Sequence, residues 1–216
     1  MNAFNHVTKP GDAAAASVSA GAALKVGGGP EHRYHVEHFE NYHADGRRCT
    51  DAACVSAWQA GRGVWHEPRL VWEDTFNNLV TTAGKNKYLD ATLKSGLTSP
   101  AWYVGLVTGP GSGNTYAAAD TMASHAGWAE DTTYSGSNRP AFTPGTISGG
   151  SVDNSAAKAV FNISNTATIA GCFMADVQAN SPGNTGTLLG VGNFTGGDRA
   201  LQNGDTLNVT VTATQS

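Results

Sequence analysis

The chain has 216 residues, enough for one large β domain or for a smaller domain with an appendage. Charged residues make up only 14% of it, and a net charge of −4 gives no basic footprint for binding DNA or RNA. Hydrophobic residues make up 40%, enough for a core, but no apolar run approaches the roughly 20 residues of a membrane span. We therefore expect a folded chain with neither nucleic acid nor membrane as a partner.

Residues 1–30 contain four consecutive alanines and end in the run Gly27-Gly28-Gly29-Pro30. No helical or strand period persists there, and Gly-rich segments of this kind are flexible. The alanine stretch follows Lys-Pro-Gly-Asp rather than a basic region, so it does not resemble a secretory signal. The sequence predicts a flexible Ala/Gly-rich N-terminal arm at 1–30, followed by a β-sandwich domain at 31–216.

The domain is predicted to start with a strand over Arg33–Tyr42, in which Tyr34, Val36 and His38 share one face. Asp45-Gly46 supplies a hairpin-type turn. The strand that should follow this turn comes only at residues 69–76. We therefore expect residues 47–68 to form an excursion inserted into the hairpin.

A helix is predicted at about residues 82–94, because Leu89 and Leu93 lie one helical turn apart on an apolar face. Thr81 or Thr82 can cap its start.

The remainder of the chain is typical of β structure, with short apolar segments separated by Gly, Pro, Asn and Ser. The last segment alternates well, with Leu207, Val209 and Val211 on one face. The predicted strands are Trp102–Val107, Thr146–Ile147, Ala157–Ile163, Ile169–Val177, Gly186–Gly192 and Thr206–Thr214. This pattern predicts a mainly β fold, a β-sandwich or jelly-roll-like domain with one short helix.

A long loop between Thr108 and Pro144 is rich in Gly, Ser and Asn and carries Trp128 and Tyr134. Loops of this length are usually functional or held in place by a partner. The two aromatic residues either anchor the loop on the sandwich or form a recognition surface, and we favour anchoring.

Potential metal ligands gather between residues 32 and 54. They are His32, His35, His38, His43, Cys49 and Cys54. Zinc takes these ligand types, but its structural sites favour paired short spacings that are absent here. On a strand His35 also points away from His32 and His38. We therefore predict no metal ligand and no cofactor.

The three cysteines have separate expected fates. Cys49 and Cys54 could form a disulfide across a short loop, but we expect reduced thiols during assembly in a cytoplasm, with oxidation later. Cys172 lies in an apolar strand and is expected to be an inert core thiol.

The sequence holds no recognised catalytic motif. Asp120, Ser124 and His125 are close in sequence, but no oxyanion-hole motif accompanies them. The alternative is that they bond their own loop backbone, and we predict no catalytic residue.

Charges are unevenly distributed. Residues 1–96 carry ten basic and ten acidic residues, whereas residues 97–216 carry three and seven. A free monomer usually keeps more surface charge for solubility. This scarcity suggests that neighbouring molecules cover much of the surface.

Several motifs, taken in order, resemble a family of small structural proteins of tailed bacteriophages. The resemblance covers residues 31–216, and its departures are residues 1–30 and 47–68. The motifs lie at Leu70–Gly84, Ala101–Leu106, Asp120–Glu130, Arg139-Pro140 and Gly204–Val209.

The resemblance implies a virion protein, assembled in the host cytoplasm and similar in kind to capsid decoration or cement proteins. Such a protein would be non-enzymatic, with the major capsid protein and further copies of itself, as a dimer or trimer, for partners. One alternative is a tail component such as a fibre, tail-tip or host-receptor-binding module. A further alternative is a metal-dependent enzyme that uses the His/Cys segment.

Overall fold

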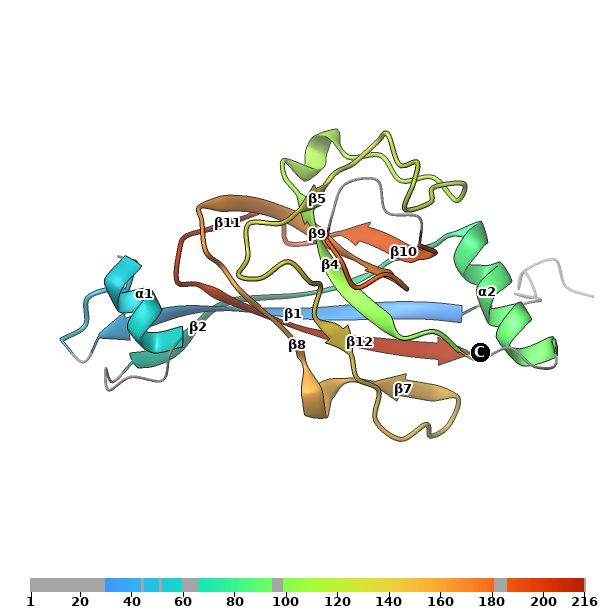
Figure 1. Cartoon of the computed structure of the whole chain (residues 1–216), viewed down its shortest axis with the longest axis horizontal. Coiled ribbons are helices and arrows are strands. Elements are labelled where there is room, and N and C mark those ends of the chain that lie inside the picture. The colour runs from blue at the N-terminus through green and yellow to red at the C-terminus, as the bar shows by residue number, and fades with distance from the viewer. Residues whose placement is uncertain are drawn as a thin grey trace, which may run out of the picture.

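Two antiparallel β-sheets dominate a computed structural model of the chain, and two α-helices accompany them within the described residues (Figure 1). The structure describes residues 30–43, 45–50, 52–59, 66–94, 99–180 and 186–215. The mainly β, sandwich-type fold predicted from the sequence is confirmed. The predicted N-terminal arm, apart from Pro30, lies outside the described residues.

The first sheet is built around a long strand, β1. Its order is β2-β1-β12-β7, with β8 also paired to β12. The strands are β1 (Pro30–His43), β2 (His66–Asn77), β7 (Ser151–Asp153), β8 (Ala159–Asn162) and β12 (Thr206–Gln215). β1 and β2 pair from Arg33↔Asn77 to His43↔His66, so residues 44–65 are an excursion between paired strands.

Alternation along these strands defines the buried face. Tyr34, Val36 and His38 are buried on β1, as the sequence predicts. A register shift between His38 and Phe39, where β2 has the extra residue Val71, interrupts the pairing, and beyond it Asn41 rather than Glu40 is buried. On β12 the buried residues are Leu207, Val209 and Val211.

The second sheet has β9 at its centre, and its order is β3-β10-β9-β4-β5, with β11 on β9 and β6 on β4. Its strands are β3 (Leu79–Val80), β4 (Trp102–Thr108), β5 (Glu130–Asp131), β6 (Ala141–Phe142), β9 (Ala167–Ala175), β10 (Leu188–Asn193) and β11 (Arg199–Leu201). Residues 169–175 of β9 are all buried, so this strand is covered on both faces.

The core lies between the two sheets. Tyr34 stacks on Phe76 with ring centroids 5.1 Å apart, and Phe161 meets Tyr134 edge to face at 5.0 Å. From the second sheet, buried aliphatic and sulfur-containing side chains complete it. They are Val104, Leu106, Ile169, Cys172, Met174, Leu189 and Leu201.

The long loop between β4 and β6 packs on the other face of the second sheet. It begins with a 3₁₀ turn at Gly111–Gly113. Trp128 is 6% exposed and lies 5.3 Å from the Phe173 ring, and Tyr134 is 4% exposed. Both aromatic residues therefore anchor the loop, as favoured from the sequence.

Arg139 fastens the end of this loop. Its guanidinium is fully buried, donates two hydrogen bonds to Glu130 at 2.7 and 2.6 Å, and donates another to the Val177 carbonyl. The guanidinium also lies over the ring of Phe173 at 5.2 Å. Two of the motif residues noted in the sequence, Glu130 and Arg139, thus form a buried ion pair.

The structure corrects the predicted strand at Thr146–Ile147. Ile147 is 73% exposed, and the strand of this region is β7, four residues later. Gly149 and Gly150 both have positive φ and form a tight turn between Ser148 and Ser151, so the pairing begins after the turn. A 3₁₀ turn at Ser155–Ala157 follows.

The structure also holds a helix beyond the one predicted. α1 (Ala52–Gln59) lies in the excursion, and α2 (Thr82–Leu93) lies where the leucine spacing indicated a helix. Within the described residues, neither helix is long and apolar enough to cross a membrane.

The face that α2 buries differs from the predicted one. Thr81 caps the helix, accepting a hydrogen bond from the Gly84 amide at 3.0 Å. Leu89 and Leu93, however, are 55% and 77% exposed, and it is Gly84 that is buried against β10. A Cβ at Gly84 would lie 2.4 Å from the Leu189 carbonyl oxygen, so glycine is what permits this close helix–sheet contact.

The close contact at Gly84 predicts that Gly84→Ala destabilises the protein, which is the opposite of the usual effect in a helix. In an exposed helix Gly→Ala stabilises by about 1 kcal/mol, but here Gly84→Ala should destabilise by about 1–3 kcal/mol, because the new methyl meets backbone. Urea unfolding checks this. Asn86→Ala, on the exposed side of α2, is the matched control and should be neutral or stabilising. A stabilised Gly84→Ala would contradict the packing of α2 on β10.

Candidate functional site

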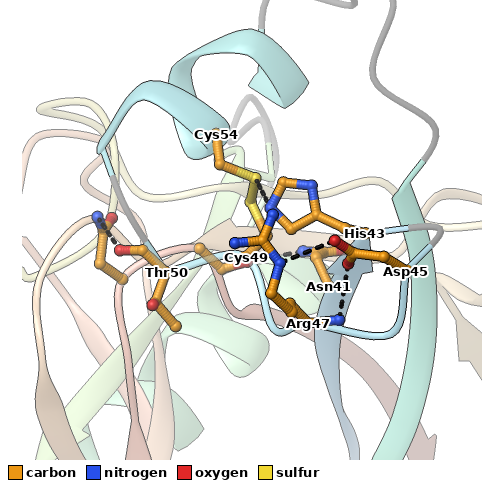
Figure 2. Close-up of a disulfide and its surroundings, with 9 residues drawn as sticks. Asn41, His43, Asp45, Arg47, Cys49, Thr50 and Cys54 are labelled. Carbon is orange, nitrogen blue, oxygen red and sulfur yellow. Dashed lines mark hydrogen bonds and ion pairs between the residues drawn. A yellow bond between two sulfur atoms is a disulfide. The ribbon is translucent and has the colours of Figure 1, made fainter.

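Of the residues proposed as ligands from the sequence, the structure brings three together at the α1 end of the molecule. Cys49 and Cys54 form a disulfide, with their Cα atoms 5.9 Å apart. His43 turns its ring toward them, with Nε2 3.1 Å from the Cys54 sulfur (Figure 2). The three potential ligand atoms all lie within 4.8 Å of one another. Of the two states left open from the sequence, this structure holds the disulfide.

Local backbone bonds shape the loop that carries His43 and Cys49. The Arg47 carbonyl accepts from the His43 amide at 2.8 Å, and the His43 carbonyl accepts from Gly46. Gly46 has φ +83°, a conformation that suits the turn predicted at this position. The Asn41 carbonyl then accepts from the Cys49 amide at 2.8 Å, which fixes the first sulfur-bearing residue.

Contacts with the turn before β12 also hold the loop that carries His43 and Cys49. Asn41 donates through Nδ2 to the Gly204 carbonyl at 2.6 Å. Gly204 has φ +92°, and a Cβ there would lie 2.6 Å from the Cys49 carbonyl oxygen. Asn203 adds a hydrogen bond to the Thr50 carbonyl at 3.3 Å. The cysteine loop therefore rests directly on the sandwich.

Buried charges make a further connection between the loop and the sandwich. Arg48 donates to both carboxylate oxygens of Asp205, at 2.7 and 2.8 Å, and lies 3.2 Å from Glu40. His38 Nε2 lies 3.0 Å from the same carboxylate, and Arg199 donates to His38 Nδ1 at 2.7 Å. Asp205 and His38 are essentially inaccessible to water.

The ionised form of Asp205 is favoured by these partners. Burial alone would raise the pKa of Asp205, but hydrogen bonds from His38, Arg48 and the Gln202 amide outweigh it and lower the pKa. The motif at Gly204–Val209, which contains Asp205, thus serves to anchor the cysteine loop. This role could not be derived from the sequence, because His38, Arg48, Arg199 and Asp205 come from four separate segments.

The other histidines of the predicted set lie apart from the sulfurs. His38 is used by the charged network, while His35 contacts Thr75 at 3.0 Å on the opposite face of β1. His32 is buried near α2, where its Nε2 lies 2.8 Å from the Tyr88 hydroxyl. The predicted failure of His32, His35 and His38 to converge is therefore confirmed, and His43 is the exception.

Cys172 is fully buried in β9, and burial raises the pKa of its thiol. This matches the inert core thiol expected from the sequence.

Asp120, Ser124 and His125 bond within their own loop. Asp120 accepts hydrogen bonds from the Ala117 amide and from the Trp128 ring nitrogen. His125 Nδ1 lies 3.0 Å from the Thr121 carbonyl, and the Ser124 amide donates to the Thr121 hydroxyl. The geometry therefore supports the alternative in which these three residues bond their own loop.

At the opposite end of the molecule, α2 presents an exposed apolar pair, Leu89 and Leu93 (Figure 1). They are four residues apart on one helix and therefore share a face. The sequence identifies these leucines only as the apolar face of the predicted helix. Spacing alone defines a common face without saying whether that face meets the sheet or solvent.

No model of a known protein family matches the chain, and no curated protein matches it either.

The buried position of His32 predicts a pH dependence of stability. Burial lowers the pKa of His32 from 6.5 to about 4. Between these values the unfolded chain binds a proton that the folded chain does not, so the free energy of unfolding falls as the pH falls. The contribution is about 3 kcal/mol over this window.

Urea unfolding of the wild type and of His32→Gln, at pH 7 and pH 4, measures this contribution. Glutamine can still hydrogen-bond Tyr88 but does not titrate, so the stability gap between the two proteins should shrink by about 3 kcal/mol at pH 4. His35→Gln, at a partly exposed histidine, should leave the gap unchanged. Parallel pH profiles for wild type and His32→Gln would contradict the prediction.

Proposed function

We propose that this chain is a non-enzymatic phage virion structural protein that binds the capsid shell as a cement or decoration protein. The observation that carries the proposal is the exposed leucine pair of α2, at the end of the sandwich where the N-terminal residues attach. The ordered motifs across residues 31–216 indicate the phage setting, by resemblance.

The leucine pair supports docking through α2 because its apolar side chains are largely exposed to water. Leu93 is 77% exposed and Leu89 55%. Transferring two such side chains from water into an interface is worth about 1.5–3 kcal/mol each when burial is complete. A solvated helix gains nothing from leucine at these positions, whereas a helix seated on another protein does.

The position of α2 adds to this argument. Pro30, the first described residue of β1, pairs with Gln215 near the end of β12. α2 lies at this same end, tied to β1 by the contact between Tyr88 and His32. β1 therefore begins beside α2, the helix that carries the exposed leucines.

The major capsid protein is the proposed partner, with further copies of this chain as neighbours. Residues 97–216 contain ten charged residues, so this part of the sandwich meets its surroundings mostly through neutral polar and apolar groups. Low charge suits a surface that is covered in an assembly.

The tail-component alternative depended on Trp128 and Tyr134 as a recognition surface. Both side chains are buried on the sandwich, so they support the fold instead of offering a receptor contact. We therefore prefer the capsid.

Binding of the purified chain to capsids that lack it tests the proposal. The double variant Leu89→Gln/Leu93→Gln keeps good helix formers in α2 and should weaken capsid binding by at least about tenfold, because the buried apolar area is lost. Cosedimentation with capsids gives the bound copies per particle.

The matched control is Leu70→Gln/Val160→Gln, which also removes two exposed apolar side chains, 48% and 46% exposed, in β2 and β8 rather than at the α2 end of β1. It should bind like the wild type. Full binding by the α2 variant, or loss of binding by the control alone, would contradict docking through α2.

A further inference from the structure

We propose that His43, Cys49 and Cys54 bind one zinc ion when the Cys49–Cys54 disulfide is reduced. The site thus has two states, a disulfide under oxidising conditions and a zinc centre under reducing conditions. It is independent of the capsid contact proposed for α2, which lies at the other end of the molecule.

The donor set fits zinc. One imidazole nitrogen and two thiolates are ligands that Zn²⁺ accepts in both structural and open sites. Zinc–sulfur and zinc–nitrogen bonds of about 2.3 and 2.0 Å place two donors of one tetrahedral ion roughly 3.5–3.8 Å apart. The three donor atoms here already lie within 4.8 Å of one another.

The backbone that presents these donors is held by bonds outside the disulfide. His43 is positioned by the turn it closes with Arg47, and Cys49 by the Asn41 carbonyl. The Arg48–Asp205 pair, between these two ligands, fastens the loop to β12. Breaking the sulfur–sulfur bond therefore leaves His43 and Cys49 in place.

The two sulfurs are shielded from water, whereas the histidine lies at the edge of the cluster. Cys49 is 2% exposed and Cys54 5%. Cys54 lies in the first turn of α1, and both sulfurs pack with Val55 in a small apolar cluster. His43 is only half-buried, so the fourth zinc position faces the more open side of the cluster, where water can complete the coordination.

The chemistry balances as two steps. A small dithiol reduces the disulfide, giving two cysteine thiols and the cyclic disulfide of the reductant. Zinc then displaces one proton from each thiol, so binding releases two protons to solvent, and neutral His43 donates its lone pair. An added small disulfide reoxidises the pair: it takes up the two electrons and becomes two thiols, while the Cys49–Cys54 bond forms again, both zinc–sulfur bonds break and the ion is released.

Zinc titration of the full chain tests the proposal. The chain is reduced with a phosphine under anaerobic conditions, and Zn²⁺ is added in competition with a chromophoric chelator. We expect one zinc per reduced chain and none per oxidised chain. His43→Ala should weaken zinc binding by more than about tenfold, and Cys49→Ser/Cys54→Ser should abolish it.

His35→Ala and Cys172→Ala are the matched controls, because they remove a histidine and a cysteine outside the cluster. Both should keep one zinc of wild-type affinity. Circular dichroism of each reduced protein reports whether the sandwich is folded. His43→Ala retains the disulfide, so it can be purified folded even where the double serine variant cannot.

Cobalt substitution gives a second readout. Co²⁺ bound to two thiolates and one imidazole in a tetrahedral site shows thiolate charge-transfer and intense d–d absorption, and His43→Ala should change this spectrum. The proposal is overturned by a reduced wild-type chain without stoichiometric zinc, by equal binding in the oxidised chain, or by wild-type affinity in His43→Ala.

Discussion

The pairing of β1 with its neighbours is the constraint on which both ends of the molecule depend. β1 is antiparallel to β12 from Pro30↔Gln215 to Phe39↔Thr206, and to β2 along its other edge. Its start contacts α2 through His32, its middle supplies Tyr34 and Val36 to the core, and its end carries His43 beside Cys54. A one-residue slip would turn each of these side chains to the opposite face.

The two ends of β1 differ in the side chains that they bring together. Near α2 the contact with the sheet is so close that Gly84 is required, and the leucines face outward. At the α1 end a register shift after His38 buries Asn41, which then holds both Cys49 and Gly204. The first end offers an apolar surface to a partner, and the second holds a compact group of sulfur and nitrogen atoms.

Much of the fold follows from local sequence patterns, because strand alternation is a local property. Leu207, Val209 and Val211 are buried as their period of two requires, and Thr81 caps α2 as its position suggests. The strand predicted at Thr146–Ile147 is wrong because these residues lie before the Gly149-Gly150 turn. Strand pairing begins only after that turn, at Ser151. Leu89 and Leu93 share the predicted apolar face of α2, but helical spacing does not say which side of a helix a sheet covers, and here the sheet covers the Gly84 side.

The candidate sites depended on contacts between distant segments, which the sequence does not encode in any local pattern. The His/Cys segment drew attention through composition, but the bulge that brings His43 beside Cys54 is a feature of the β1–β2 register. The network of His38, Arg48 and Asp205 joins β1, the loop and the turn before β12. Only the folded chain shows that this network fixes the cysteine loop.

The copy number of this protein in purified virions, measured by quantitative mass spectrometry against the major capsid protein, tests the central claim most directly. A cement or decoration protein follows the symmetry of the shell, so we predict on the order of hundreds of copies in a simple ratio to the capsid protein. A handful of copies in multiples of three or six would instead indicate a tail part, and absence from the particle would contradict the virion role.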